Sequence, residues 1–288
     1  MKQGSLTRIA PTPSGFLHIG NALSFAVTSA LAEKTGAAVL LRIDDLDQAR
    51  ARPEYLQDIF DTLHFLDIPW QQGPVSVADF KEKYTQEKRM PLYNQALQRL
   101  RDADRLFACD CSRTLLVQQP CCCAQRSLSL DTPGTSWRIR TDSSPVSFYT
   151  AAGERIEKKM PESMQHCIVR KKDGYPSYQL ASVCDDIYWN VDLIVRGQDL
   201  FDSTIAQLFL ARYLDASSFT QAVFCHHPLI EQHGVKLSKS AGATAIRYLR
   251  QRQKNSAAVY QLMAEAIGLT TKISDRHSLT AHLPFALC

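Results

Sequence analysis

A turn rich in proline and glycine follows the first apolar run of the chain. The run spans residues 6–10, and a helical pattern over residues 22–34 follows the turn. A strand, a turn and a helix form the first half of a βαβ unit, and the N-terminus of such a helix presents unpaired N–H groups and a positive dipole end to phosphate. Gly15 and Gly20 would let a ligand approach the backbone closely, and His18 can donate a hydrogen bond to a phosphate oxygen. The turn therefore predicts a nucleotide site, although it carries neither of the two commonest glycine-rich fingerprints.

Two short motifs, far apart in the chain, resemble the signatures of class I aminoacyl-tRNA synthetases. His18-Ile19-Gly20-Asn21 is similar to the first signature, His-Ile-Gly-His, whose last residue varies. Residues 236–240, Lys-Leu-Ser-Lys-Ser, are similar to the second, Lys-Met-Ser-Lys-Ser, which lies on a mobile loop. Two motifs in this order, at the ends of one α/β segment, are far more specific than either alone. The alternatives are a glycine-bounded helix start with a core histidine and an ordinary solvated loop that contains lysines.

The resemblance implies adenylation chemistry, in which ATP, accompanied by Mg²⁺, meets an acid at the α-phosphorus and pyrophosphate leaves. The protein then contributes positioning and electrostatic stabilisation. The catalytic residues that the resemblance implies are His18, Lys236 and Lys239. The ATP-binding residues that it implies are His18, Gly20, Asn21, Lys236, Ser238 and Lys239.

The stretch of residues 8–15, Arg-Ile-Ala-Pro-Thr-Pro-Ser-Gly, narrows the resemblance. It is similar to the Arg-Phe-Ala-Pro-Ser-Pro-Thr-Gly opening of glutamyl-tRNA synthetases and of their short paralogues, the glutamyl-queuosine tRNA(Asp) synthetases. Residues 6–242 follow the catalytic core of that subfamily in order. The amino-acid-binding residues that this resemblance implies are Arg8, Ile9, Ala10, Pro11, Thr12, Asp44, Tyr178 and Arg196.

Arginine at two of these positions suits an acidic substrate, because a guanidinium group binds a carboxylate through two parallel hydrogen bonds. For Arg8 and Arg196 the alternative is a structural salt bridge with nearby acids. Asp44 departs from the family, which usually has a glutamate there to meet the α-amino group of the substrate, and is one methylene shorter. The sequence therefore predicts the type of reaction more directly than it predicts which amino acid is the substrate.

Five of the nine cysteines lie close together, in Cys109-Asp110-Cys111 and Cys121-Cys122-Cys123. An odd total with one tight cluster favours a metal site in a reducing compartment over a disulfide framework. Two pairs of thiolates can close a tetrahedral shell, so we expect the ligands Cys109, Cys111, Cys121 and Cys123 for a structural Zn²⁺. Cys122 could replace either neighbour, and reduced cysteines without a metal are the alternative. Glutamyl-queuosine synthetases resemble this region, although their zinc loop is longer and contains a tyrosine.

Apolar runs and helical patterns alternate along the chain and predict an α/β fold. Residues 39–43 have the pattern of a buried parallel strand, and helices are expected from Pro53 and over residues 88–102. Segments 168–170, 179–183 and 193–195 are expected to resume the nucleotide fold, before a helix over residues 203–213 and a strand over residues 223–227. Two helices, over residues 244–254 and 256–268, are expected in the tail, the second with Ser256 as its cap.

The resemblance implies a Rossmann-type parallel sheet, the class I synthetase catalytic domain, with an inserted region that holds the zinc loop and resembles the acceptor-binding region. We expect its first half at residues 1–106, the insertion at residues 107–167, and its second half with the lysine loop at residues 168–242. A short helical extension without an anticodon-binding domain is expected at residues 243–288.

The composition limits the class of protein but does not indicate a function. The chain has 288 residues, is 45% hydrophobic and carries a net charge of +4, which fits contact with nucleic acid without arguing for it. No segment has the pattern of a signal peptide or a membrane span, so a cytoplasmic protein without membrane contact is expected. Arg247, Arg250 and Lys254 form a basic stripe, which a solvated face explains at least as often as RNA contact does.

The expected function is ATP-dependent activation of L-glutamate and its transfer to the queuosine base at the wobble position of tRNA(Asp). Two alternatives remain. One is a glutamyl-tRNA synthetase-like core that charges a tRNA 3′ end with the help of a partner, and the other is a non-catalytic module that binds an adenylate or RNA.

Overall fold

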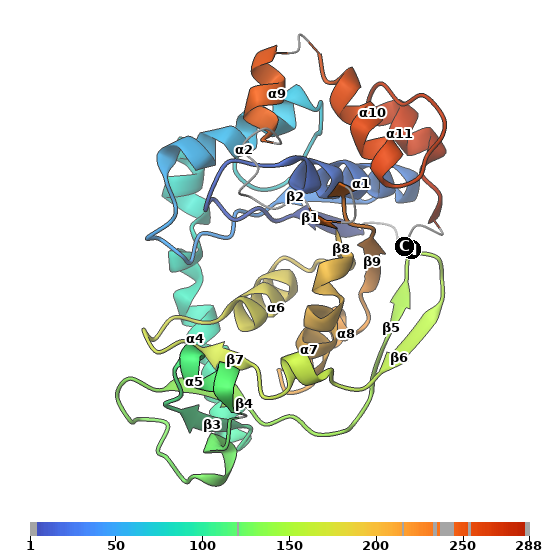
Figure 1. The fold of residues 1–288 in the computed structure, drawn as a ribbon. Coiled ribbons are helices and arrows are strands. Elements are labelled where there is room, and N and C mark those ends of the chain that lie inside the picture. The colour runs from blue at the N-terminus through green and yellow to red at the C-terminus, as the bar shows by residue number, and fades with distance from the viewer. Residues whose placement is uncertain are drawn as a thin grey trace.

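A six-stranded, mostly parallel sheet forms the centre of the computed structural model (Figure 1). The structure describes residues 5–119, 121–214, 216–232, 235–236, 245–252 and 255–285. The strands are, in their order across the sheet, β2 (Ala38–Leu41), β1 (Leu6–Ile9), β8 (Leu193–Gly197), β9 (Val223–His227), β5 (Val146–Thr150) and β6 (Arg155–Lys158). Only β6 runs antiparallel to its neighbour. The predicted Rossmann-type α/β class is confirmed.

Helices cover both faces of this sheet and enclose two hydrophobic cores. On one face lie α1 (Ile19–Thr35), α2 (Pro53–Phe65), α9 (Ile246–Arg252), α10 (Ala257–Ala266) and α11 (Arg276–His282). On the other lie α4 (Met90–Asp102), α6 (Tyr178–Tyr188), α7 (Phe201–Ala211) and α8 (Ser217–Thr220). Side chains alternate along a strand, so Val39 and Leu41 enter the first core while Leu40 enters the second. This double burial explains why β2 is apolar throughout.

The order of the strands reverses between β1 and β8. From β1 the chain passes through α1 to β2 on one side, and from β8 it passes through α7 to β9 on the other. In open parallel sheets a crevice forms at such a switch point, outside the carboxyl ends of the strands. Arg8 lies on β1 and Arg196 lies on β8, so the fold places the two arginines on either side of this crevice.

A second, three-stranded antiparallel sheet contains β3 (Leu106–Cys109), β4 (Ser136–Ile139) and β7 (Ile168–Arg170). It lies at the end of the molecule opposite α10 and α11, beside the short helix α5 (Arg113–Gln118) (Figure 1). Strands β5 and β6, which lie within residues 107–167, pair instead with the central sheet through β9. The predicted domain boundaries stay a prediction, because this segment contributes to both sheets.

Two element predictions need correction, the one for segment 168–170 and the one for the cap at Ser256. Segment 193–195 lies in β8 as expected, but 168–170 forms β7 of the small sheet, and 179–183 lies inside helix α6. Helix α6 packs against the central sheet, so segment 179–183 does belong to the nucleotide fold as expected. Ser256 precedes α10, yet its side chain makes no capping hydrogen bond.

The remaining short elements are α3 (Val77–Asp79), β10 (Glu231–Gln232) and β11 (Val235–Lys236). No helix within the described ranges is both long and apolar enough to span a bilayer.

Candidate active site

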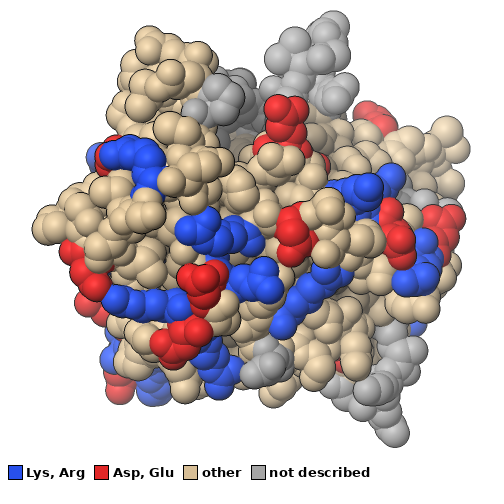
Figure 2. Space-filling view, turned by 90° about the horizontal axis from the view of Figure 1, so that it is seen from below, with Lys and Arg blue, Asp and Glu red and all other residues tan. Residues whose placement is uncertain are grey.

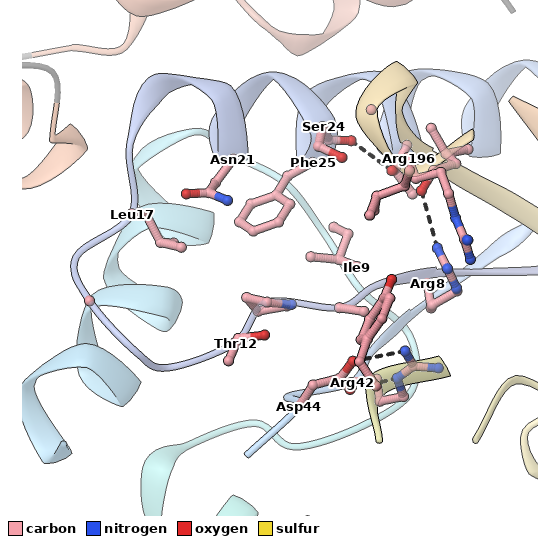
Figure 3. Close-up of a pocket in the computed structure, with 18 of the residues that line it drawn as sticks. Arg8, Ile9, Thr12, Leu17, Asn21, Ser24, Phe25, Arg42, Asp44 and Arg196 are labelled. Atoms are coloured by element: carbon pink, nitrogen blue, oxygen red, sulfur yellow. Dashed lines mark hydrogen bonds and ion pairs between the residues drawn. The ribbon is translucent and has the colours of Figure 1, made fainter. Parts of the chain in front are cut away.

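A cavity of about 290 Å³ opens at the switch point between β1 and β8. All eight residues predicted to bind the amino acid line it: Arg8, Ile9, Ala10, Pro11, Thr12, Asp44, Tyr178 and Arg196. Gly15 and Asn21 from the histidine turn also line it, whereas His18 and Gly20 are not among its lining residues. Figure 3 shows Arg8 and Arg196 at one end of the cavity and Leu17 and Asn21 at the other.

The lysine signature contributes little to the described geometry. Lys236 belongs to β11 by its backbone, and nothing is described of its side chain. Ser238 and Lys239 lie outside the described residues. Their predicted roles therefore stay predictions.

The histidine turn is organised by its own hydrogen bonds. His18 is the N-cap of α1, and its Nδ1 accepts a hydrogen bond from the backbone N–H of Gly20 at 3.1 Å. The Asn21 side-chain oxygen accepts from the backbone N–H of His18, also at 3.1 Å, which completes a capping box. With Nδ1 an acceptor, a neutral His18 ring carries its proton on Nε2, which is then the donor. A Cβ on Gly20 would lie 3.0 Å from two ring atoms of His18, so a larger residue there would press on the imidazole.

Asp58, which the sequence gave no reason to single out, supports this turn from α2. Its Oδ2 accepts from the backbone N–H of Leu17 at 2.9 Å, and its Oδ1 accepts from Arg250 Nη1 at 3.3 Å. The backbone N–H of Ile246 donates to the Leu17 carbonyl at 2.8 Å. The segment that follows the lysine loop is thus attached to the histidine turn.

The basic stripe of the tail is at least partly structural. Arg250 pairs with Asp58 and also with Asp61 at 3.1 Å, and the Arg247 guanidinium lies 4.6 Å from the Phe16 ring centroid. Lys254 lies outside the described residues.

Asp186 joins two arginines of the cavity and was also missed in the sequence. Its Oδ1 accepts from Arg8 Nε at 2.9 Å and from Arg42 Nη1 at 2.6 Å, and the carboxylate is fully buried. Although burial opposes ionisation, Arg8 and Arg42 hold the pKa of Asp186 below its usual value. The alternative considered for Arg8, a structural salt bridge, is therefore present in the structure, while Arg8 also lines the cavity.

Asp44 is held by a fork of hydrogen bonds from Arg42. Arg42 Nε donates to Oδ1 at 2.8 Å and Nη2 donates to Oδ2 at 2.9 Å. Burial raises the pKa of Asp44, and the adjacent Arg42 charge opposes that rise. The shorter side chain that departs from the family is thus fixed in one orientation at the wall of the cavity.

Arg196, unlike Arg42, has one edge of its guanidinium group without hydrogen bonds to the described residues, and we call this edge the open fork. Its Nη1 donates to Gln207 Oε1 at 2.8 Å and to Thr204 Oγ1 at 3.3 Å. Its Nε and Nη2 are buried and have no hydrogen-bond partner within the described residues. Burial, together with the nearby Arg8 and Arg42 charges, lowers the pKa of Arg196 to about 10, so the group is still protonated at neutral pH. Two parallel donors without a partner fit a carboxylate.

The four predicted cysteine ligands lie together beside the small sheet. The sulfur atoms of Cys109, Cys111, Cys121 and Cys123 all lie within 4.8 Å of one another, whereas Cys122 is exposed. Three contacts between these sulfurs measure 3.5, 3.6 and 4.0 Å. Zinc bound by four thiolates at about 2.3 Å would separate the sulfurs by about 3.8 Å. The donor set and its spacing are therefore consistent with zinc.

The described residues on the face of the molecule in Figure 2 have no charge pattern that would indicate where a nucleic acid binds. There, lysine and arginine side chains alternate with aspartate and glutamate and form no continuous basic patch.

The fold and the crevice define a class. A family model for the catalytic domain of class I tRNA synthetases (E and Q) matches residues 6–120 and 132–277. The chain therefore belongs to the class I aminoacyl-tRNA synthetases of the glutamate and glutamine group, and is a ligase of that type.

Within this class the chain is similar to proteins named glutamyl-Q tRNA(Asp) synthetase. The one from Prochlorococcus marinus is 32% identical over 265 residues, covering 86% of this chain and 77% of its own length. The one from Symbiobacterium thermophilum is 32% identical over 284 residues, covering 91% of this chain and 86% of its own length. A glutamate–tRNA ligase from Saccharophagus degradans is 30% identical, and only 52% of its length is covered.

A solved structure supports the fold alone. The glutamate-tRNA synthetase from Elizabethkingia anophelis superposes with a TM-score of 0.74 at 17% identity, over 98% of this chain. The chain spans 66% of that structure.

Proposed function

We propose that this chain activates L-glutamate with ATP and transfers it to the queuosine base at the wobble position of tRNA(Asp). The substrate class is supported by the open fork of Arg196, a buried cation beside Arg8 with two donors that have no partner in the described parts of the chain. The similarity to glutamyl-Q tRNA(Asp) synthetases over nearly the whole chain supports the choice of acceptor.

In the first step, an oxygen of the substrate α-carboxylate attacks the α-phosphorus of ATP. The bond to the bridging oxygen breaks, and pyrophosphate leaves with its electron pair. The substrate side-chain carboxylate would bind at the arginine end of the cavity, with the triphosphate beside the N-terminus of α1. His18 Nε2–H, Lys236 and Lys239 would stabilise the charge that develops on the phosphate oxygens, and Mg²⁺ would accompany the ATP.

In the second step, a hydroxyl of the cyclopentene diol of queuosine attacks the carbonyl carbon of the mixed anhydride. AMP leaves with the electron pair of the broken bond, and the hydroxyl proton passes to solvent. Asp44 would meet the α-ammonium group of glutamate, either directly or through a water.

The cysteine cluster would hold Zn²⁺ in a structural role. Four thiolates leave no open coordination position, so this ion would stabilise the loop and take no part in the chemistry.

The test combines two readouts. The purified chain is incubated with ATP and labelled glutamate, and with tRNA(Asp) containing queuosine, tRNA(Asp) lacking it, or tRNA(Glu). We expect label only on the first RNA, and we expect the label to remain after enzymatic removal of the 3′-terminal adenosine. Label on tRNA(Glu) that is lost with this adenosine would instead support the glutamyl-tRNA synthetase alternative.

A variant of the lysine signature and a matched control test whether the signature takes part in the reaction. Lys239→Ala should lower pyrophosphate exchange by about a hundredfold or more, whereas Lys272→Ala, at an exposed lysine of the tail, should retain it. Wild-type protein that binds ATP without exchanging pyrophosphate, with or without tRNA, would favour the non-catalytic module.

A further inference from the structure

Arg196 differs from the other buried arginines of the structure in its partners. The described part of the chain buries four arginines: Arg8, Arg42, Arg89 and Arg196. The first two pair with Asp186, Arg42 also pairs with Asp44, and Arg89 pairs with Asp185 at 2.7 Å. Within that part, Arg196 makes no ion pair. Asp186 acts on Arg196 electrostatically but does not pair with it directly, and burying an arginine without a paired carboxylate is costly, so its retention there needs an explanation.

Two neutral side chains of helix α7 hold Arg196 instead. Gln207 and Thr204 lie one turn apart on α7, and both accept from the same nitrogen, Nη1. A guanidinium group only donates, so the amide of Gln207 must turn its oxygen toward Arg196. Gln207 is fully buried, and its Nε2 has no partner among the described residues. This arrangement fixes the guanidinium by one corner and leaves its buried Nε and Nη2 without a partner among the described residues, in a side chain that lines the cavity.

His226, from the neighbouring strand β9, completes the support without adding charge. Its Nε2 lies 2.8 Å from Thr204 Oγ1. Burial, together with the Arg196 charge, lowers the pKa of His226 to about 3, so the ring is neutral at physiological pH. The positive charge of Arg196 therefore remains uncompensated by its supporting side chains.

We propose that Gln207 is a positioning residue that determines selectivity for a side-chain carboxylate over a carboxamide. Its neutral amide aims the open edge of Arg196 into the cavity and leaves the cationic charge for the substrate. A carboxylate fills both donors and supplies the counter-charge. A carboxamide has a single oxygen and would turn its own NH₂ toward one donor. This inference rests on the proposed function, since it concerns how the same site distinguishes glutamate from glutamine.

An isosteric change separates this role from packing. In Gln207→Glu, a carboxylate would face Nη1 at the same place and would neutralise Arg196 internally. Gln207→Met keeps a similar volume but removes the acceptor without adding charge. Gln221→Glu adds the same charge at an exposed position after α8 and serves as the matched control.

The experiment measures binding of glutamate and glutamine by titration calorimetry, and pyrophosphate exchange with each amino acid, for the wild type and the three variants. We expect Gln207→Glu to weaken glutamate about tenfold or more while glutamine binding and the KM for ATP change less than about threefold. Gln207→Met should weaken glutamate about threefold, and Gln221→Glu should match the wild type.

The outcomes separate the inference from the function on which it rests. If Gln207→Glu keeps the wild-type preference for glutamate and melts at the wild-type temperature, the inference fails while the proposed function stands. If Gln207→Glu does not fold, Gln207→Met decides, and unchanged glutamate affinity in that variant overturns the inference. If the wild type binds neither amino acid, with and without ATP, both fail.

Discussion

At the scale of single residues, the arginines that line the cavity differ in how their charges are paired. Arg8 and Arg42 share the buried carboxylate of Asp186, and Arg42 also holds Asp44, so these groups form a nearly balanced set. Arg196 is held by neutral groups and keeps an open edge. The neutral state of His226 belongs to the same arrangement, because a second positive charge beside Arg196 would oppose folding.

The buried imidazole predicts a dependence of stability on pH. The pKa of His226 is lowered to about 3, first by burial and then by the Arg196 charge, whereas an unfolded histidine titrates near 6.5. Below about pH 6.5 the unfolded chain binds a proton that the folded chain does not, so this histidine reduces stability as the pH falls and has no such effect above. Between pH 7 and pH 5 the contribution is about 2 kcal/mol.

Urea unfolding at these two pH values tests this expectation. The free energy of unfolding should fall more steeply in the wild type than in His226→Gln, by about 2 kcal/mol over the interval. Equal pH dependence in the two proteins would contradict the assignment of a neutral, buried ring.

At the scale of elements, α2, the histidine turn and α9 are connected to one another, which holds the segment after the lysine signature beside the histidine turn. Asp58 accepts from Leu17 just before His18 and from Arg250 on α9, and Ile246 at the start of α9 bonds the Leu17 carbonyl. An antiparallel bridge also joins His18 to Ala245. The end of the lysine-bearing segment is thereby fixed to the start of α1.

Replacing Asp58 should weaken ATP binding more than glutamate binding. In Asp58→Asn one of the two donors, Leu17 N–H or Arg250, would face an NH₂ group, and the loss of a buried charge-assisted bond costs about 1–3 kcal/mol. We expect the KM for ATP to rise about tenfold with little change in the KM for glutamate, measured by pyrophosphate exchange.

Asp61→Asn is the matched control, since Asp61 binds the same arginine but is partly exposed and does not contact the turn. If both variants change the KM for ATP equally, the effect comes from Arg250 alone and the proposed link through Leu17 is wrong.

At the scale of the whole molecule, the two sheets support two separate sites, the cavity and the cysteine cluster. The central sheet with its two cores positions the cavity, while the cysteine cluster packs with Phe107 in a small cluster of its own beside the three-stranded sheet. A metal ion there would close a loop of local sequence and would stabilise it independently of the cavity.

Metal content should follow the geometry of the cluster. We expect about one zinc ion per chain in the wild type and in Cys122→Ser, and much less in Cys111→Ser, measured by atomic emission after dialysis. Cys111→Ser should also melt earlier, because an incomplete shell leaves buried thiols without their ion. Metal lost equally from both variants would show that Cys122 is a ligand and that the cluster differs from the one described.

The sequence by itself determined what depends on neighbours within a few residues. The turn with its histidine and glycines before a helix, and two cysteine pairs that can converge, are set by local spacing, whereas the capping hydrogen bond of His18 was seen only in the structure. Apolar runs likewise predicted the α/β class, although the run at 168–170 pairs in the small antiparallel sheet and not in the central one.

Only the tertiary structure decided which acid pairs with which base. Asp186 lies 178 positions from Arg8 and 144 from Arg42, and Asp58 lies 192 positions from Arg250, so no local pattern indicated these pairs. The same holds for the partners of Arg196. Two neutral side chains on α7 leave its fork open, whereas a carboxylate at that place would have closed it. Hydrogen bonds act over about 3 Å, so residues far apart in sequence meet only when the sheet and its helices have been assembled.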